Sequence, residues 1–70
     1  MNIFVTRAAQ TAYNRAGYSK DEAYQRGEHV ARYVQENLTT CKKLYHVEDE
    51  FELAYRVAQT MVAYERASMQ

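Results

Sequence analysis

Apolar residues in the first segment of the chain, residues 3–16, recur every three or four positions, which is the period of an α-helix. On a helical wheel they share one face, whereas Arg7, Gln10 and Asn14 share the other. Because most of them are alanines, a second helix backbone can approach this face closely. The apolar face comprises Phe4, Val5, Ala8, Ala9, Ala12, Tyr13 and Ala16.

Gly17 stands directly after this segment, where a helix C-cap is expected. A short strand at residues 3–5 is an alternative reading of the N-terminus, but the chain offers no second strand signal to pair with it. The chain has no proline and only two glycines, so long helices are favoured over many short strands.

The second helix has the clearest start, because Ser19 and Glu22 match a capping box and Tyr18 precedes it at the staple position. Its apolar stripe continues far enough for the helix to reach about residue 44. Otherwise the helix breaks near residues 37–40, where helix formers are weak. The stripe consists of Ala23, Gly27, Val30, Ala31, Val34, Leu38, Cys41 and Tyr45.

The third helix is predicted to start near Asp49, which has capping-box spacing to Glu52 and lies in an acidic cluster suited to a helix N-terminus. Its apolar arc covers about 200°, twice the width of an ordinary amphipathic stripe. This helix therefore contacts more than one neighbour, either two helices of its own chain or a dimer partner. The arc comprises Phe51, Leu53, Ala54, Tyr55, Val57, Ala58, Met61, Val62 and Tyr64.

These patterns predict one all-α domain over residues 1–70. Its architecture is a small three-helix bundle, or a long helical hairpin with a shorter N-terminal helix packed on it. A core of this size supplies only about 3–5 kcal/mol, and small proteins often add a disulfide, a metal or a partner subunit. Cys41 is the one cysteine, so no intrachain disulfide forms. With no signal sequence and no membrane-spanning apolar run, the sequence predicts a cytoplasmic protein.

Nine basic and nine acidic side chains give a net charge of zero, which argues against a protein that holds nucleic acid by bulk charge. The charges are unevenly distributed. Residues 1–47 hold seven basic and four acidic side chains, whereas residues 48–70 hold two and five. The two parts therefore attract each other, within one fold or between copies.

Seven tyrosines stand out in this composition, since tyrosine is enriched at protein interfaces and among their hot spots. Four of them fall on the semi-exposed shoulders of the second and third helices. Glu65 is anomalous because it projects onto the apolar arc. It either pairs with tyrosine hydroxyls or an arginine of the first helix, or frays past the core with residues 65–70, the reading we favour. The candidate partner-binding residues are Tyr24, Tyr33, Tyr55, Tyr64 and Glu65.

The favoured function is a protein–protein interaction module, an adaptor or inhibitor that occupies the surface of a larger protein or of a second copy. A nucleic-acid-associated protein is the alternative, because Arg15, Arg32 and Arg56 each lie near a tyrosine. A thiol enzyme using Cys41 and His46 is a remote alternative, since no motif fixes a nucleophile or a metal site. No cofactor, metal or membrane partner is expected.

Overall fold

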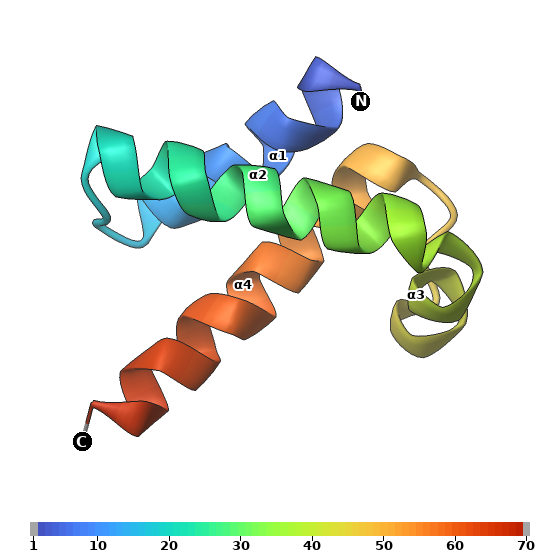
Figure 1. Ribbon diagram of the computed structural model, residues 1–70. Coiled ribbons are helices and arrows are strands. Elements are labelled where there is room, and N and C mark those ends of the chain that lie inside the picture. Colours follow the sequence, from blue (N-terminus) through green and yellow to red (C-terminus); the bar gives the residue numbers. More distant parts are fainter. Residues whose placement is uncertain (1, 70) are drawn as a thin grey trace.

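The computed structural model describes residues 2–69, and this part of the chain is helical with no strand. The predicted all-α fold, a small helical bundle, is therefore confirmed (Figure 1). Four helices follow one another: α1 (Ile3–Arg15), α2 (Lys20–Glu36), α3 (Leu38–Tyr45) and α4 (Glu50–Ser68).

The helix ends are set by local side-chain and backbone chemistry. Ser19 Oγ accepts a hydrogen bond from the backbone N–H of Glu22 at 3.2 Å, and Asp49 caps α4 by accepting from the N–H of Phe51 at 2.8 Å. Gly17 follows α1 with a φ of 96°, a conformation that glycine adopts without strain. The predicted starts near Ser19 and Asp49, and the predicted end at Gly17, are confirmed.

The helix breaks at Asn37, between α2 and α3, so of the two alternatives for this segment the break near residues 37–40 is correct. Asn37 has a φ of −127° and a ψ of 34°, outside the helical region. Its side-chain amide donates to the carbonyl of Tyr33 at 2.9 Å. A short polar side chain that bonds to nearby backbone competes with helix continuation, which explains why α3 is a separate helix.

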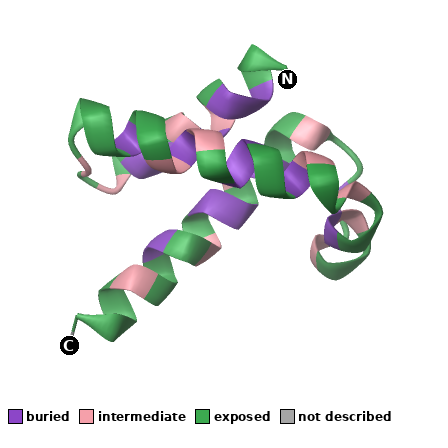
Figure 2. Cartoon of the chain, viewed as in Figure 1, coloured by how far each residue is buried: buried purple, intermediate pink, exposed green. Residues whose placement is uncertain are grey.

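Helix α1 packs extensively against both α2 and α4, whereas α2 and α4 contact each other much less. The approach of α1 to α2 is close at Gly27, where an added Cβ would lie 3.0 Å from the backbone nitrogen of Gln10. The core between the helices is built mainly of alanine and valine, with Leu53 and Tyr13 as its largest members. Figure 2 shows the buried positions where the helices cross and a mostly exposed C-terminal end of α4.

Phe4 was expected on the core face of the first helix, but its side chain is 61% exposed. Its neighbour Val5 is fully buried and takes the core position instead. Because successive residues of a helix diverge by about 100°, both cannot point at the same neighbour in the first turn.

Candidate binding groove

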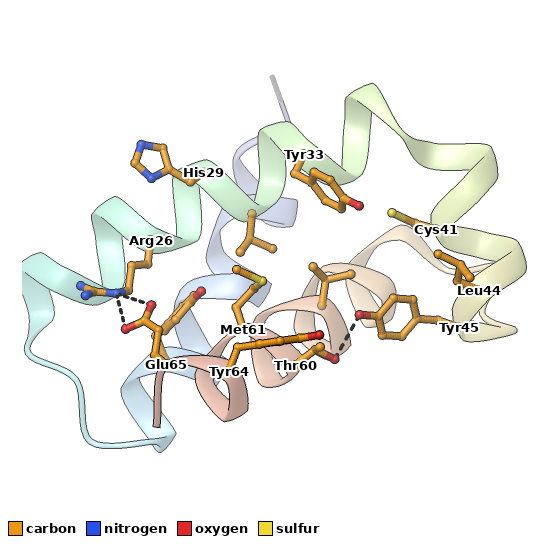
Figure 3. A pocket seen from close by; sticks show the side chains of 13 residues that line it. Arg26, His29, Tyr33, Cys41, Leu44, Tyr45, Thr60, Met61, Tyr64 and Glu65 are labelled. Atoms are coloured by element: carbon orange, nitrogen blue, oxygen red, sulfur yellow. Dashed lines mark hydrogen bonds and ion pairs between the residues drawn. The ribbon is translucent and has the colours of Figure 1, made fainter. Parts of the chain in front are cut away.

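A groove of about 540 Å³ lies between α2 and α4, with α3 at one end. It forms because α2 and α4 both pack mainly on α1 and so diverge from each other. Side chains from all four helices line it. We call it the α2–α4 groove, and Figure 3 shows it from close by.

The floor of the α2–α4 groove is buried and largely apolar. It is formed by Val30, Cys41, Val57 and the ring of Tyr13, each no more than 5% exposed. The Tyr13 hydroxyl has no hydrogen-bond partner within residues 2–69. Within these residues, every side-chain nitrogen or oxygen that is shielded from solvent has a hydrogen-bond partner. The unpaired Tyr13 hydroxyl is therefore accessible to solvent, and because Tyr13 lines the groove, it faces the groove.

The rim of the α2–α4 groove carries four large apolar or aromatic side chains that remain in contact with solvent. Tyr33 is 50% exposed, Leu44 67%, Met61 42% and Tyr64 68%. They come from α2, α3 and α4, which are distant in the sequence. Exposed apolar side chains that gather in this way around a hollow mark an interaction site more often than scattered ones do.

Two polar bridges cross the α2–α4 groove, one toward each end (Figure 3). At one end Arg26 Nε of α2 donates to both carboxylate oxygens of Glu65 on α4, at 2.9 and 3.2 Å. At the other end the Tyr45 hydroxyl of α3 donates to Thr60 Oγ1 of α4 at 3.0 Å. Between the bridges the groove is mainly apolar, and its two opposite charges neutralise each other.

Glu65 is held inside α4, so the expectation that it frays past the core is wrong. The alternative was that Glu65 pairs with tyrosine hydroxyls or with an arginine of the first helix. Glu65 does have such partners, but its arginine, Arg26, belongs to α2. The Tyr18 hydroxyl also donates to Glu65 at 2.9 Å, and the Arg26 guanidinium carbon lies 4.9 Å from the Tyr18 ring centroid. Glu22, four residues before Arg26, adds a second carboxylate at 3.3 Å.

These contacts shift the pKa values of the cluster in a consistent direction. The hydrogen bond from Arg26, aided by that from Tyr18, holds the pKa of Glu65 below its usual range, although partial burial opposes this. The hydrogen bond to Glu65 raises the pKa of Arg26. Burial, together with the Glu65 charge, raises the pKa of the phenols of Tyr13 and Tyr18. At neutral pH Glu65 is therefore a carboxylate paired with the Arg26 guanidinium, and the phenols of Tyr13 and Tyr18 are neutral.

The structure brings together three of the five candidate residues, since Tyr33, Tyr64 and Glu65 all line the α2–α4 groove. Tyr24 is 51% exposed but does not line it. Tyr55 faces away, because it precedes Tyr64 by nine residues and so lies about 180° around α4. Tyr55 packs beside α1 instead, where its hydroxyl accepts from Arg15.

Sequence reasoning missed Leu44 and the bridging residues Tyr45 and Thr60. Leu44 could not be placed, because the break at Asn37 resets the phase of the helix that carries it. Met61 was assigned to the apolar arc but not to a site. Its position three residues before Tyr64 and four before Glu65, on the same face of the helical wheel, was the available signal.

The residues considered for chemistry do not form a reactive centre in the described part of the chain. Burial raises the pKa of the Cys41 thiol, which favours the unreactive neutral form. His46 is exposed and ends α3 in the left-handed conformation, with a φ of 55°. His29 is also exposed. Within residues 2–69, no three His, Cys, Asp or Glu side chains gather where a metal ion could bind.

Comparisons with models of protein families, with curated proteins and with solved structures found no match for this chain. Among the helices of residues 2–69, none has the length and apolar character needed to cross a membrane. Function is therefore inferred from the α2–α4 groove and from the surfaces around it.

Proposed function

We propose that this chain is a cytoplasmic protein–protein interaction module with no chemistry of its own. In this proposal its α2–α4 groove receives an apolar anchor side chain of a larger protein. Binding would occupy that partner's surface, as an adaptor or inhibitor does. The observation that carries the proposal is the gathering of Tyr33, Leu44, Met61 and Tyr64 around a buried floor. Hot spots at protein interfaces are commonly aromatic anchors in such pockets.

The dimensions of the α2–α4 groove favour one or two side chains over a long embedded helix. Thr60 and Glu65, which carry the two bridges on α4, are five residues apart, or roughly 7.5 Å along a helix axis. The volume of about 540 Å³ is in the range of sites that enclose a compact ligand group. A bulky aromatic or branched aliphatic anchor matches this space.

The charge of the α2–α4 groove favours an uncharged anchor. Arg26 and Glu65 neutralise each other, and the rest of the wall is mainly apolar or phenolic. A charged anchor would lose its hydration without gaining a free counter-charge. The Tyr13 hydroxyl on the floor supplies one open hydrogen-bonding group for a polar atom at the tip of an otherwise apolar anchor.

The exposed rim favours a protein over a small molecule as the occupant. A small molecule in the groove would cover the floor but leave the outer parts of Leu44 and Tyr64, more than 60% exposed, in water. A protein surface that inserts one anchor would cover the floor and the rim together. This arrangement, a central anchor surrounded by contacts that exclude water, is typical of protein interfaces.

Affinity capture from the source cells with matched tyrosine variants tests the proposal. Tyr33→Ala and Tyr64→Ala remove rim rings, and Tyr24→Ala removes an equally exposed ring outside the groove from the same helix as Tyr33. Each captured protein is then purified, and its Kd for all four chains is measured. We expect Kd to rise at least tenfold for the two rim variants and to stay unchanged for Tyr24→Ala.

Two results would contradict the proposed function. One is an equal rise in Kd for all three variants, which would indicate a general loss of structure or binding through a different surface. The other is a chain that sediments as a monomer and recovers no protein partner. If the chain instead dimerises and the rim variants dissociate it, the occupant of the groove is a second copy.

A further inference from the structure

The opposite face of α4 carries a second hollow, of about 420 Å³, between α1 and α4. Its polar side chains are Arg15 from the end of α1 and Tyr55, Gln59 and Arg66 from α4. Small alanine and valine side chains form the rest of its surface. This α1–α4 hollow shares none of its residues with the α2–α4 groove.

Both arginines of the α1–α4 hollow are held in place by contacts within the protein. Arg15 Nη1 donates to the Tyr55 hydroxyl at 2.9 Å, and its guanidinium carbon lies 5.6 Å from the Tyr55 ring centroid. Arg66 Nη2 donates to the carbonyl of Ala16, the residue that follows Arg15. A guanidinium has five N–H donors, so each of these arginines keeps donors for a ligand.

The α1–α4 hollow has an uncompensated positive charge. None of the residues that line it is acidic. Within residues 2–69, Arg15 and Arg66 make no ion pair, whereas Arg26, Lys42 and Arg56 each have a carboxylate partner within 4 Å. Two fixed guanidinium groups without a counter-charge repel each other, and a bound anion would relieve that repulsion.

We propose that the α1–α4 hollow is a binding site for a phosphate group. Two guanidinium groups match the charge of about −1.5 to −2 that phosphate carries near neutral pH. Their planar donors also match its oxygens in paired hydrogen bonds. Gln59 and the Tyr55 hydroxyl add uncharged hydrogen-bonding groups beside them. A carboxylate, with a single charge, would leave one arginine uncompensated.

Nuclear magnetic resonance titration of the full chain tests this site. Inorganic phosphate is added at pH 7.5 with sodium chloride adjusted to constant ionic strength, and phenyl phosphate and acetate are tested in the same way. We expect saturable shifts of the backbone N–H signals of Arg15, Tyr55, Gln59 and Arg66, and of the side-chain N–H signals of the two arginines and Gln59. Acetate is expected to bind at least fivefold more weakly than phosphate. Tighter binding of phenyl phosphate would indicate an organic monoester as the ligand, and equal binding would indicate free phosphate.

Variants separate the site from general surface charge. Arg15→Gln and Arg66→Gln each remove one guanidinium group of the hollow, and each is expected to weaken phosphate binding at least fivefold. Arg32→Gln removes an exposed arginine of α2 that does not line the hollow, and it is expected to leave binding unchanged.

The proposal is overturned if phosphate causes no saturable shifts in the unaltered chain. It is also overturned if Arg32→Gln weakens binding as much as the other two variants. If Arg15→Gln and Arg66→Gln lower the melting temperature but leave phosphate binding unchanged, the two arginines serve to stabilise the C-terminal end of α1, and the phosphate site is rejected. None of these results bears on the α2–α4 groove.

Discussion

Arg26 on α2 and Glu65 on α4, 39 residues apart, are joined by hydrogen bonds of 2.9 and 3.2 Å from one guanidinium nitrogen to both carboxylate oxygens. This bridge links two helices that otherwise make limited contact, and it forms one end of the α2–α4 groove. Tyr18, from the turn between α1 and α2, adds its hydroxyl to the same carboxylate. The bridge therefore connects three parts of the fold.

We expect Glu65→Leu to lower the melting temperature, because it leaves Arg26 and the Tyr18 hydroxyl without their shared partner. The side chains of Arg26 and Glu65 are each 33% exposed, so the loss should be about 1 kcal/mol or less. Thermal unfolding followed by circular dichroism measures it. An unchanged melting temperature and unchanged oligomeric state would show that the bridge contributes nothing.

The stabilising effect of Glu65 should depend on pH. Its pKa is lower in the folded protein than in the unfolded chain, where it is about 4.3. The folded state therefore binds the proton less readily, and this contribution is present above pH 4.3 and lost as pH falls through the folded pKa. Urea unfolding of the unaltered chain and of Glu65→Gln should show a difference at pH 7 that disappears in strong acid. A difference that persists there would contradict this origin.

Two tyrosines in contact should respond differently to removal of the hydroxyl. Tyr18→Phe removes a hydrogen bond to Glu65, and we expect a loss of about 1 kcal/mol. Tyr13→Phe should change the free energy of unfolding by less than about 0.5 kcal/mol, because its hydroxyl has no partner within residues 2–69. The rings pack edge to face, with centroids 5.3 Å apart, and both variants keep this contact. A large loss in Tyr13→Phe would contradict an open hydroxyl on the groove floor.

Gly27→Ala should destabilise the protein, although alanine is favoured over glycine in a helix by about 1 kcal/mol. The added Cβ would lie 3.0 Å from the backbone nitrogen of Gln10, so α1 and α2 must separate. We expect a net loss of about 1–3 kcal/mol, measured by urea unfolding. Gln25→Ala in the exposed part of the same helix is the control and should stay within about 0.5 kcal/mol. A stabilised Gly27→Ala variant would show that the two backbones are not constrained here.

Cys41 should react slowly with thiol reagents in the folded protein. Its side chain is 1% exposed, and burial raises the pKa of its thiol, so both access and thiolate formation are reduced. Labelling at pH 8 should be at least tenfold slower than in the chain unfolded in urea. Equal rates would indicate that the groove floor opens readily.

The sequence predicted the helices well where local chemistry decides, as at Ser19, Gly17 and Asp49. It could not choose whether the helix breaks at Asn37, because a short side chain that competes for backbone hydrogen bonds is tolerated in some helices and ends others. Of the five residues it nominated, Tyr33, Tyr64 and Glu65 line the groove and Tyr24 and Tyr55 do not, because a helical wheel places residues around one axis only. It could not bring Leu44 or Arg26 to the same site, because that depends on the angles at which helices cross.

The wide apolar arc of α4 was also predicted from the sequence, and the structure shows what two portions of it contact. One part of the arc lies in the core, where Ala54 and Ala58 are fully buried, and α4 packs mainly against α1. Another part, with Met61 and Tyr64, forms the rim of the α2–α4 groove. A wheel shows how wide an arc is, but it cannot show which portion a neighbouring helix covers.

Helices α2 and α4 both pack mainly against α1. The distance between them therefore depends on α1 residues, most of which do not line the groove. Ala9 is fully buried in α1 and does not line the groove. A larger residue at this position would push the neighbouring helices away from α1. The width of the α2–α4 groove would then change, although the substituted residue does not line it. If the groove binds a partner as proposed, substitution of small buried residues of α1 would change which anchor fits, while the residues that touch the partner stay the same.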